Sequence, residues 1–207
     1  MIKRIERRYD KMTKEKTNQT NVQLQQLKKE QIDVEITGVT SLLMEAQDEF
    51  AAENIERKKT KQVPIEDRRT AEEKYENKKW KTSDGKPGIL ASAFHKGMIA
   101  VAPYIEGLDM KRVRGSVRVL GDVIPINYKT EKTNIKFGKD SGMTKAPRKI
   151  VRPEFTNWSC KIRVVYNSTN ISAEQVINLL NWAGFQVGVG GFRPEHSGNF
   201  GQYEVKK

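Results

Sequence analysis

The sequence is poor in the residues that form disulfides and bind metals. It has one cysteine, Cys160, and two histidines, His95 and His196. A single cysteine excludes an intrachain disulfide framework and a zinc site built on several thiolates. No carboxylate pattern of a metal-dependent nuclease stands out either. We therefore expect neither a metal site nor a bound cofactor.

Long apolar runs are also missing. No stretch approaches the roughly 20 apolar residues that a membrane-spanning helix needs. The first eight residues, MIKRIERR, are charged and lead into no apolar segment, unlike a secretory signal. We expect a cytoplasmic protein without a membrane partner. The hydrophobic content of 36% over 207 residues is enough for one modest core.

Negative charge is in deficit. The formal net charge is +12 and the isoelectric point is about 9.7, which favours a polyanionic partner such as nucleic acid. Residues 1–30 carry nine Lys/Arg against four Asp/Glu, and we interpret them as a basic arm, either mobile or marginally helical. Residues 31–207 are expected to form a single domain.

Hydrophobic periodicity predicts the elements of this domain. Strand patterns cover residues 32–39, 114–120, 122–128, 159–166, 185–189 and 202–205, and helix patterns cover residues 89–102 and 172–184. The second helix begins with a capping box, Ser172 to Gln175, and should end at Gly184. Without its insertions, the order is β-α-β-β-α-β, an α+β ferredoxin-like plan with an antiparallel sheet and helices on one face.

Two insertions interrupt this plan. Residues 45–85 are rich in charge and poor in large apolar groups, and we expect an exposed insertion with a helix near residues 65–75 begun by Pro64. Residues 130–157 contain glycines and prolines with little periodicity, which predicts a basic loop. From Lys136 to Arg163, eight Lys/Arg oppose two acidic residues, so 28 residues carry +6 of the net +12.

The segment of residues 184–205 has the most distinctive composition. It holds six glycines, four aromatic residues and Arg193. Glycine lets a backbone approach closely, arginine matches phosphate geometry, and rings such as Phe192 can stack on bases. The spacing fits neither a dinucleotide-binding G-x-G-x-x-G motif nor a P-loop. A tight hairpin with glycines only for its turns is the alternative to a segment that contacts a phosphate backbone.

Cations and aromatic residues alternate in and around the basic loop. Phe137, Phe155 and Trp158 lie near the charges, a mixture that suits single strands because cations follow the backbone and rings stack on bases. A solvated loop that binds nothing is the alternative. The candidate cations are Lys136, Lys139, Lys145, Arg148, Lys149 and Arg152, with Lys161 and Arg163 on the outward face of the adjoining strand.

Catalytic residues are harder to find. His196 lies in the Gly-rich segment and could act as an acid or base in RNA cleavage, but no partner is evident. His95 falls within a helix pattern, and Cys160 falls on the core face of a strand. We assign no catalytic residue.

Three stretches carry a family resemblance: VTSLLM at residues 39–44, GILASAFHKGM at residues 88–98, and the Gly-rich segment. They resemble small phage and prophage proteins. The Gly-rich ending is similar to the glycine-rich loop of the RAMP superfamily, the ferredoxin-like RNA-binding proteins of CRISPR complexes, and the layout is closest to Cas7-type subunits. The resemblance covers residues 31–206. The long charged insertion and the Gln-rich arm depart from the family pattern.

The resemblance implies an RRM/RAMP-type fold, a nucleic-acid strand across one face, an insertion acting as a thumb or finger, and self-assembly along the strand. Such subunits often lack catalysis. The role of the loop would fall on Gly188, Gly190, Gly191, Arg193, Gly198 and Gly201.

Three hypotheses follow for the function. The first is a non-catalytic protein of phage origin that binds single-stranded RNA or DNA. The second is a metal-independent endoribonuclease of the Cas6 kind that uses His196 or His95. The third is a protein-interaction factor that inhibits a host defence complex.

Overall fold

Four strands from distant parts of the sequence form one antiparallel sheet in the computed structural model, which describes residues 27–47, 49–63, 65, 68–139 and 147–206. The strands are β1 (Lys29–Gly38), β4 (Val117–Val119), β8 (Ser159–Asn167) and β9 (Tyr203–Val205). Their order across the sheet is β4-β8-β1-β9, and every neighbouring pair is antiparallel. With α4 (Ala91–Val101) and α6 (Ala173–Gln186) as the connecting helices, this is the predicted ferredoxin-like plan.

The alternation predicted for the two central strands is confirmed. In β8, Cys160, Ile162, Val164 and Tyr166 are buried, whereas Lys161 and Arg163 are exposed. In β1, Val34 and Ile36 are buried towards the same core. Burial raises the pKa of the Cys160 thiol to about 12, as expected for a cysteine that fills the core and does not react.

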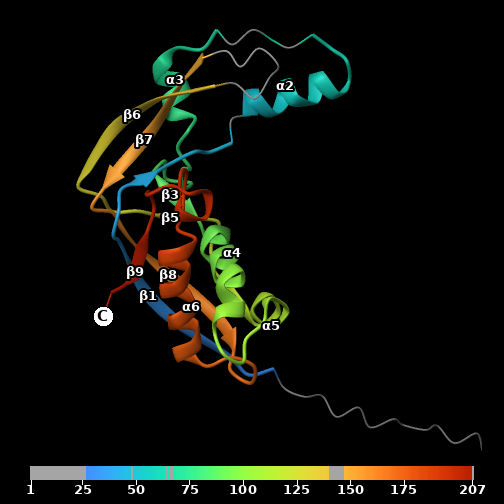
Figure 1. Ribbon diagram of the computed structural model, residues 1–207, viewed down its shortest axis with the longest axis vertical. Helices are drawn as coiled ribbons and strands as arrows, with labels where there is room; N and C mark the ends of the chain where they lie inside the picture. Colours follow the sequence, from blue (N-terminus) through green and yellow to red (C-terminus); the bar gives the residue numbers. More distant parts are fainter. Residues whose placement is uncertain (1–26, 48, 64, 66–67, 140–146, 207) are drawn as a thin grey trace, which may run out of the picture.

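The core lies between the sheet and the two helices. α4 and α6 both cover one face of the main sheet (Figure 1). Small residues let the helices approach each other, since a Cβ built on Gly97 would lie 3.2 Å from the Cβ of Ala183. Phe94 of α4 packs edge-on against Tyr203 of β9, with ring centroids 5.3 Å apart. The contact between Phe94 and Tyr203 thus joins the last strand, β9, to α4, the first helix of the ferredoxin-like plan.

The chain between α4 and β4 differs from the expectation. A 3-10 turn, Ala102–Tyr104, follows α4, and then α5 covers Met110–Ser116, where the sequence predicted the start of a strand. The side chain of Asp109 caps α5 by accepting the N–H of Arg112 at 2.8 Å, and this cap competes with the strand pattern. Only Val117–Val119 join the sheet.

α6 begins at the predicted capping box but does not end at Gly184. It continues to Gln186, so the predicted strand at residues 185–189 is wrong. Gly184 has a packing role: a Cβ there would lie 2.0 Å from the carbonyl oxygen of Tyr203. The glycine therefore allows α6 to lie directly against the backbone of β9.

Residues 130–139 and 147–156 form two paired strands, called the hairpin below, so the prediction of a loop is wrong for these residues. β6 (Thr130–Lys139) pairs along its whole length with β7 (Pro147–Thr156), and β2 (Leu42–Leu43) pairs with the other edge of β7. The hairpin rises above the upper end of the main sheet (Figure 1). The alternation was hidden because lysine, asparagine and threonine occupy many positions, and because β7 contains Pro147 and Pro153.

A third, two-stranded sheet forms from β3 (Gly88–Leu90) and β5 (Val123–Pro125). The strand predicted at residues 122–128 thus exists in part. It pairs with β3, which comes before α4, and not with β4 as a local hairpin.

The described residues of the first insertion include two helices. These are α2 (Glu49–Lys59) and α3 (Ala71–Glu76). The predicted helix at residues 65–75 starts later than expected, because Thr70 and Glu73 form a capping box. Pro64 and residues 1–26, the greater part of the predicted basic arm, lie outside the described residues.

Polar side chains attach α3 to the hairpin. The Tyr75 hydroxyl donates to Oε1 of Glu131 at 2.8 Å, and Nζ of Lys79 lies 2.6 Å from the same oxygen. Burial raises the pKa of Glu131, but hydrogen bonds from Lys79 and Tyr75 outweigh it and the net direction is downward. Burial and then the hydrogen bond to Glu131 raise the pKa of Tyr75 to about 12.

Glu131→Gln is expected to lower the free energy of unfolding by about 1 kcal/mol at pH 7, because Tyr75 and Lys79 lose a charged partner. The pKa of Glu131 is depressed below its ordinary value of 4.5, so its contribution is present above that pH and is lost as the pH falls through the depressed pKa. Urea unfolding at pH 7 and pH 3 measures this. Glu53→Gln, in a surface pair with Arg57, is the control and should change little. Equal unfolding energies of the wild type and Glu131→Gln at pH 7 would contradict the prediction.

Candidate nucleic-acid interface

The Gly-rich loop, residues 187–202 between α6 and β9, is fixed by backbone hydrogen bonds to the segment after β1. The N–H of Gly191 donates to the carbonyl of Leu43 and the N–H of Gly201 donates to the carbonyl of Ser41, both at 2.8 Å. Within the loop, the N–H of Val189 donates to the carbonyl of Gly201 at 2.9 Å. A short 3-10 turn, Pro194–His196, forms its tip. The loop is therefore a defined structure and not a simple hairpin turn.

Glycine is required in this loop where backbones meet. Gly201 has φ +70°, and a Cβ there would lie 1.8 Å from the carbonyl oxygen of Val189. Gly190 has φ +80°, and its Cβ would lie 2.3 Å from the carbonyl oxygen of Leu43. Both glycines thus serve the packing of the loop itself. Contact of the glycines with phosphate stays a prediction for all five of them in the loop, Gly188, Gly190, Gly191, Gly198 and Gly201.

Arg193 stands at the entrance to the 3-10 turn and is half-buried. Its Nε and Nη2 donate to Oε2 of Glu195 at 2.9 and 2.5 Å, and its Nη1 donates to the carbonyl of Gly190 at 3.1 Å. The predicted phosphate-binding arginine is thus engaged in hydrogen bonds within its own loop.

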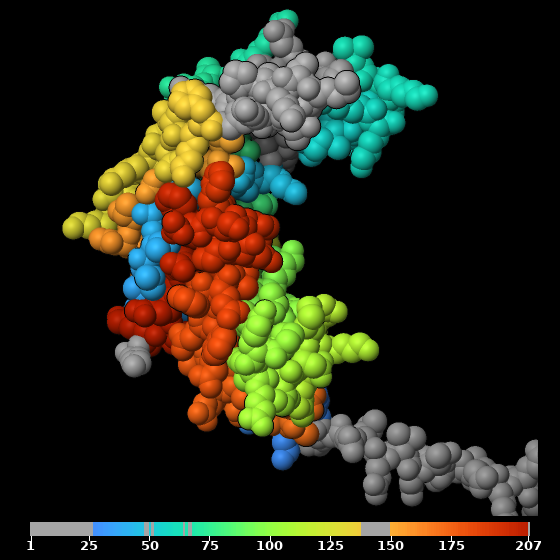
Figure 2. Space-filling view, viewed as in Figure 1, coloured from blue at the N-terminus to red at the C-terminus, as the bar shows by residue number. Residues whose placement is uncertain are grey.

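The loop and the hairpin meet at an aromatic and cationic cluster. Nζ of Lys136, on β6, lies 5.3 Å from the ring centroid of Phe192 and 5.2 Å from that of Phe200. The guanidinium of Arg152, on β7, lies 4.7 Å from the Phe192 centroid. These distances fit cation–π interactions. In Figure 2, the red C-terminal segment and the yellow hairpin strand form one continuous surface. The structure thus brings together the Gly-rich segment and the cations of residues 130–157, which the sequence analysis selected separately.

Arg152 is the buried member of this cluster. It is 8% exposed, and its Nη2 lies 2.8 Å from Oε1 of Glu45, which follows β2. Its Nε finds no hydrogen-bond partner among the described residues. Arg152 thereby connects the hairpin, the Gly-rich loop and the segment after β2, which makes it a structural residue as well as a candidate cation.

The other predicted cations separate into two groups. Lys139, Arg148 and Lys149 belong to the far end of the hairpin strands, and Lys145 lies outside the described residues. Lys161 and Arg163 lie on the open face of the main sheet, away from the helices.

This open face is not a continuous basic surface. Nε of Arg163 lies 2.8 Å from Oδ1 of Asp33, and Lys161 stands opposite Glu35 in the strand register. The hydrogen bond and charge of Arg163 lower the pKa of Asp33. Among the described residues, the outward positions of β1 and β8 also include no aromatic side chain, so the face offers no stacking platform.

A groove runs between α4 and the Gly-rich loop. Two adjoining hollows of about 520 and 220 Å³ share Leu90, Ala93, Lys96, Gly190 and Arg193 as lining residues. The larger hollow is also lined by Trp80, His196 and Phe192, and the smaller by Ser92 and Glu195. Lys96 and Trp80 were not predicted as site residues. Each is a single side chain in an ordinary context, and no pattern in the sequence marks it.

The two histidines lie in different surroundings. His196 lines the groove and is exposed, with Nε2 4.0 Å from Oε2 of Glu195. His95 is half-buried on α4, and its Nε2 has no hydrogen-bond partner among the described residues. Burial first, and then the charges of Arg118 and Arg114, lower the pKa of His95. Among the described residues, Glu195 is thus the nearby acidic group for His196, and this one pair does not by itself define a catalytic site.

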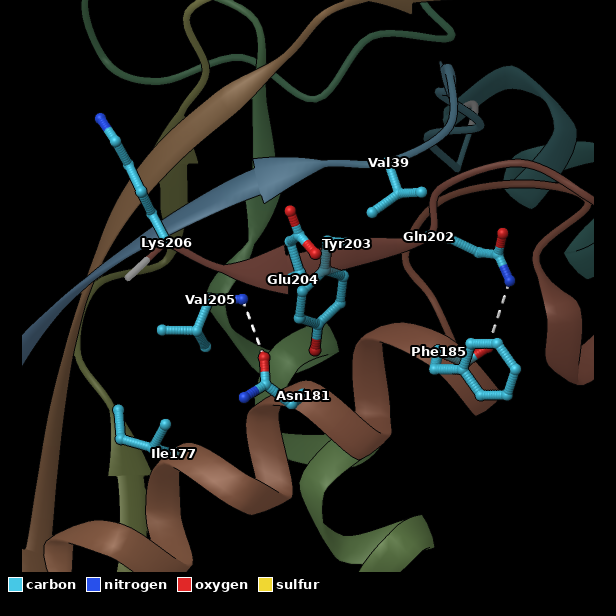
Figure 3. Close-up of a pocket in the computed structure, with 9 residues that line it drawn as sticks. All are labelled: Val39, Ile177, Asn181, Phe185, Gln202, Tyr203, Glu204, Val205 and Lys206. Carbon is cyan, nitrogen blue, oxygen red and sulfur yellow. Dashed lines mark hydrogen bonds between the residues drawn. The ribbon is translucent and has the colours of Figure 1, made fainter.

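A separate hollow of about 760 Å³ lies between α6 and β9 (Figure 3). Its walls are largely apolar, with Val39, Ile177, Phe185 and Val205 among the lining residues. Oδ1 of Asn181 accepts the N–H of Val205 at 2.9 Å and so closes the outer edge of β9. Lys206 is its one lining cation among the described residues, so this hollow is not the candidate nucleic-acid interface.

The fold of this chain is similar to that of solved structures, although its sequence matches no family profile. No protein-family profile and no curated protein sequence matches the chain. Solved structures do match. One is a chain in the cryo-EM structure of the type III-B Cmr-beta bound to cognate target RNA, with a TM-score of 0.52 and 15% identity over 99% of this chain. This chain spans 65% of the length of that one. Another is Cmr6 from Pyrococcus furiosus, with a TM-score of 0.45, 10% identity, and coverage of 87% of this chain and 100% of that one.

The predicted fold class is thus confirmed: an α+β, ferredoxin-like fold with an antiparallel sheet and a charged helical insertion, and the Cmr-beta chain shares this fold. Within the described ranges, no helix is both long and apolar enough to cross a membrane.

Proposed function

We propose that the protein binds single-stranded nucleic acid, RNA or DNA, without cleaving it. The observation that carries this proposal is the meeting of the Gly-rich loop with the hairpin, where Lys136 and Arg152 contact Phe192. Cations next to exposed rings favour single strands, because a duplex hides the faces of its bases. The Cmr-beta structure that shares this fold was solved with target RNA, which makes RNA the first ligand to test.

In this proposal, the strand follows the groove between α4 and the Gly-rich loop and continues onto the hairpin. Lys96 and Arg193 line the groove, and Lys136 stands at its hairpin end. Trp80 and Phe192 offer apolar ring surface beside these cations. Phosphates would contact the lysines and the arginine, and bases would contact the rings. Lys139, Arg148 and Lys149, at the ends of β6 and β7, would extend the same path along the hairpin, and Lys145, outside the described residues, stays a predicted contact.

The open face of the main sheet has a smaller part in this proposal, because Asp33 already neutralises Arg163. Self-assembly along the strand, phage origin and a cytoplasmic location stay predictions.

Fluorescence anisotropy with single-stranded RNA, single-stranded DNA and duplex of equal length, each across a salt series, tests the proposal. We expect salt-sensitive single-strand binding with the probe intact afterwards. Probe cleavage in EDTA would instead support the endoribonuclease hypothesis. Absence of single-strand binding at moderate salt would overturn the proposal and favour the protein-interaction hypothesis, which a pull-down after nuclease treatment examines.

Lys96→Ala and Lys136→Ala are each expected to weaken single-strand binding about five- to tenfold, since each removes one charge-assisted hydrogen bond to the strand. The slope of log K against log salt should become shallower by about 0.7 for each phosphate that the variant no longer neutralises. Lys111→Ala, on α5 and outside the groove, is the control and should match the wild type. If all three variants bind alike, the groove is not the path of the strand.

A further inference from the structure

The Nε–Nη2 edge of Arg193 is already occupied. Both nitrogens donate to Oε2 of Glu195, and Nη1 donates to the carbonyl of Gly190. This edge is one of the two that can hold a phosphate in bidentate fashion. A phosphate that binds at this Nε–Nη2 edge of Arg193 must therefore take the position of the Glu195 carboxylate.

The turn after Arg193 brings Glu195 back towards the Arg193 side chain. The N–H of His196 donates to the carbonyl of Arg193 at 2.9 Å, and the N–H of Ser197 donates to that of Pro194 at 2.9 Å. Ser197 then adopts the left-handed conformation, with φ +58°, and ends the turn. This backbone geometry places Glu195 where its carboxylate can reach the guanidinium of Arg193.

The exposure of this ion pair differs from that of the Arg152–Glu45 pair, which also lies next to the Gly-rich loop. The Arg152–Glu45 pair has an arginine side chain that is 9% exposed, so solvent and ligand reach it poorly. The side chains of Arg193 and Glu195 are 31% and 42% exposed. A pair this exposed is held weakly, because water and salt screen it, and it can be exchanged for another anion.

We propose that Glu195 competes with the nucleic-acid backbone for Arg193, and that binding displaces its carboxylate from the guanidinium. The inference rests on the proposed function. It assigns Glu195 as the residue that sets affinity and salt dependence at this position. Arg193 contributes less to binding in the wild type than its geometry allows, because part of the new interaction replaces an existing one.

Glu195→Gln tests this inference first. Single-strand binding at low salt should tighten about two- to fivefold, the range of an exposed ion pair. The slope of log K against log salt should become steeper by up to about 0.7. Glu106→Gln makes the same change of charge in the exposed loop before α5, outside the groove, and should match the wild type.

A double-mutant cycle makes the test specific to the pair. Arg193→Ala should weaken binding at least about twofold more in the Glu195→Gln background than in the wild type. Equal losses in the two backgrounds would mean that the two charges act independently, and would overturn this inference alone. Wild-type protein that binds no single strand would instead overturn the proposed function.

Discussion

Replacing Gly201 with alanine is expected to lower the free energy of unfolding by about 3 kcal/mol. Two effects add. The backbone at Gly201 has φ +70°, which costs a residue with a side chain about 1–2 kcal/mol. The new Cβ would also lie 1.8 Å from the carbonyl oxygen of Val189, so the two backbones must separate. The loop that carries Phe192 and Arg193 would move, and we expect single-strand binding to weaken as well.

Gly107→Ala is the matched control for this prediction. Gly107 has φ +75°, but a Cβ there would meet nothing within 4 Å. Its replacement should therefore lower the free energy of unfolding only by the cost of the left-handed backbone conformation, about 1 kcal/mol, and leave binding unchanged. Urea unfolding and anisotropy at a temperature where both variants are folded measure the difference. If the two variants are equally stable, close backbone packing is not the reason for glycine at position 201.

Arg152→Met is expected to lower the free energy of unfolding by about 2 kcal/mol and to weaken single-strand binding about tenfold. Methionine keeps much of the volume but leaves Glu45 without its partner and removes the cation–π interaction with Phe192. The loss stays below the 3–5 kcal/mol of fully buried pairs because Glu45 is partly exposed and can be hydrated again. Binding weakens because the loop and the hairpin lose their fixed relative position.

Arg163→Met provides the comparison for Arg152. Arg163 also pairs with a carboxylate, that of Asp33 at 2.8 Å, but both side chains are more than half exposed. Exposed pairs contribute little, so the variant should unfold at nearly the wild-type denaturant concentration and bind almost as well. Similar effects of the two substitutions would contradict the structural role that we assign to Arg152.

The order of the main elements could be predicted because its signals are local. The alternation in residues 159–166 and the capping box at Ser172 depend on neighbours in the sequence. The hairpin of β6 and β7 could not be predicted, because polar residues and prolines hide its alternation and because the segments that contact it, β2 and α3, lie far away in the sequence. The end of α6 was misplaced for the same reason: Gly184 looked like a stop signal, whereas it serves the packing against Tyr203.

In the candidate site too, the residue types could be predicted from the sequence, whereas the contacts between distant segments could not. Phe192, Arg193, Lys136 and Arg152 could be selected by residue type and composition. Their distances could not be derived from the sequence, because Phe192 follows Arg152 by 40 residues and Lys136 by 56 residues. The pairing of Arg193 with Glu195 depends on the shape of one turn.

The pairing of β2 with β7 has a consequence for evolution. β2 belongs to the chain between β1 and α4, and β7 belongs to the chain between β4 and β8, yet they share one sheet. If the chain between β1 and α4 lost β2, or the chain between β4 and β8 lost β7, the remaining strand would keep an unpaired edge, which invites association with other chains. We expect descendants of this fold to gain and lose these two strands together, so that the lengths of the two segments rise and fall in step across related sequences.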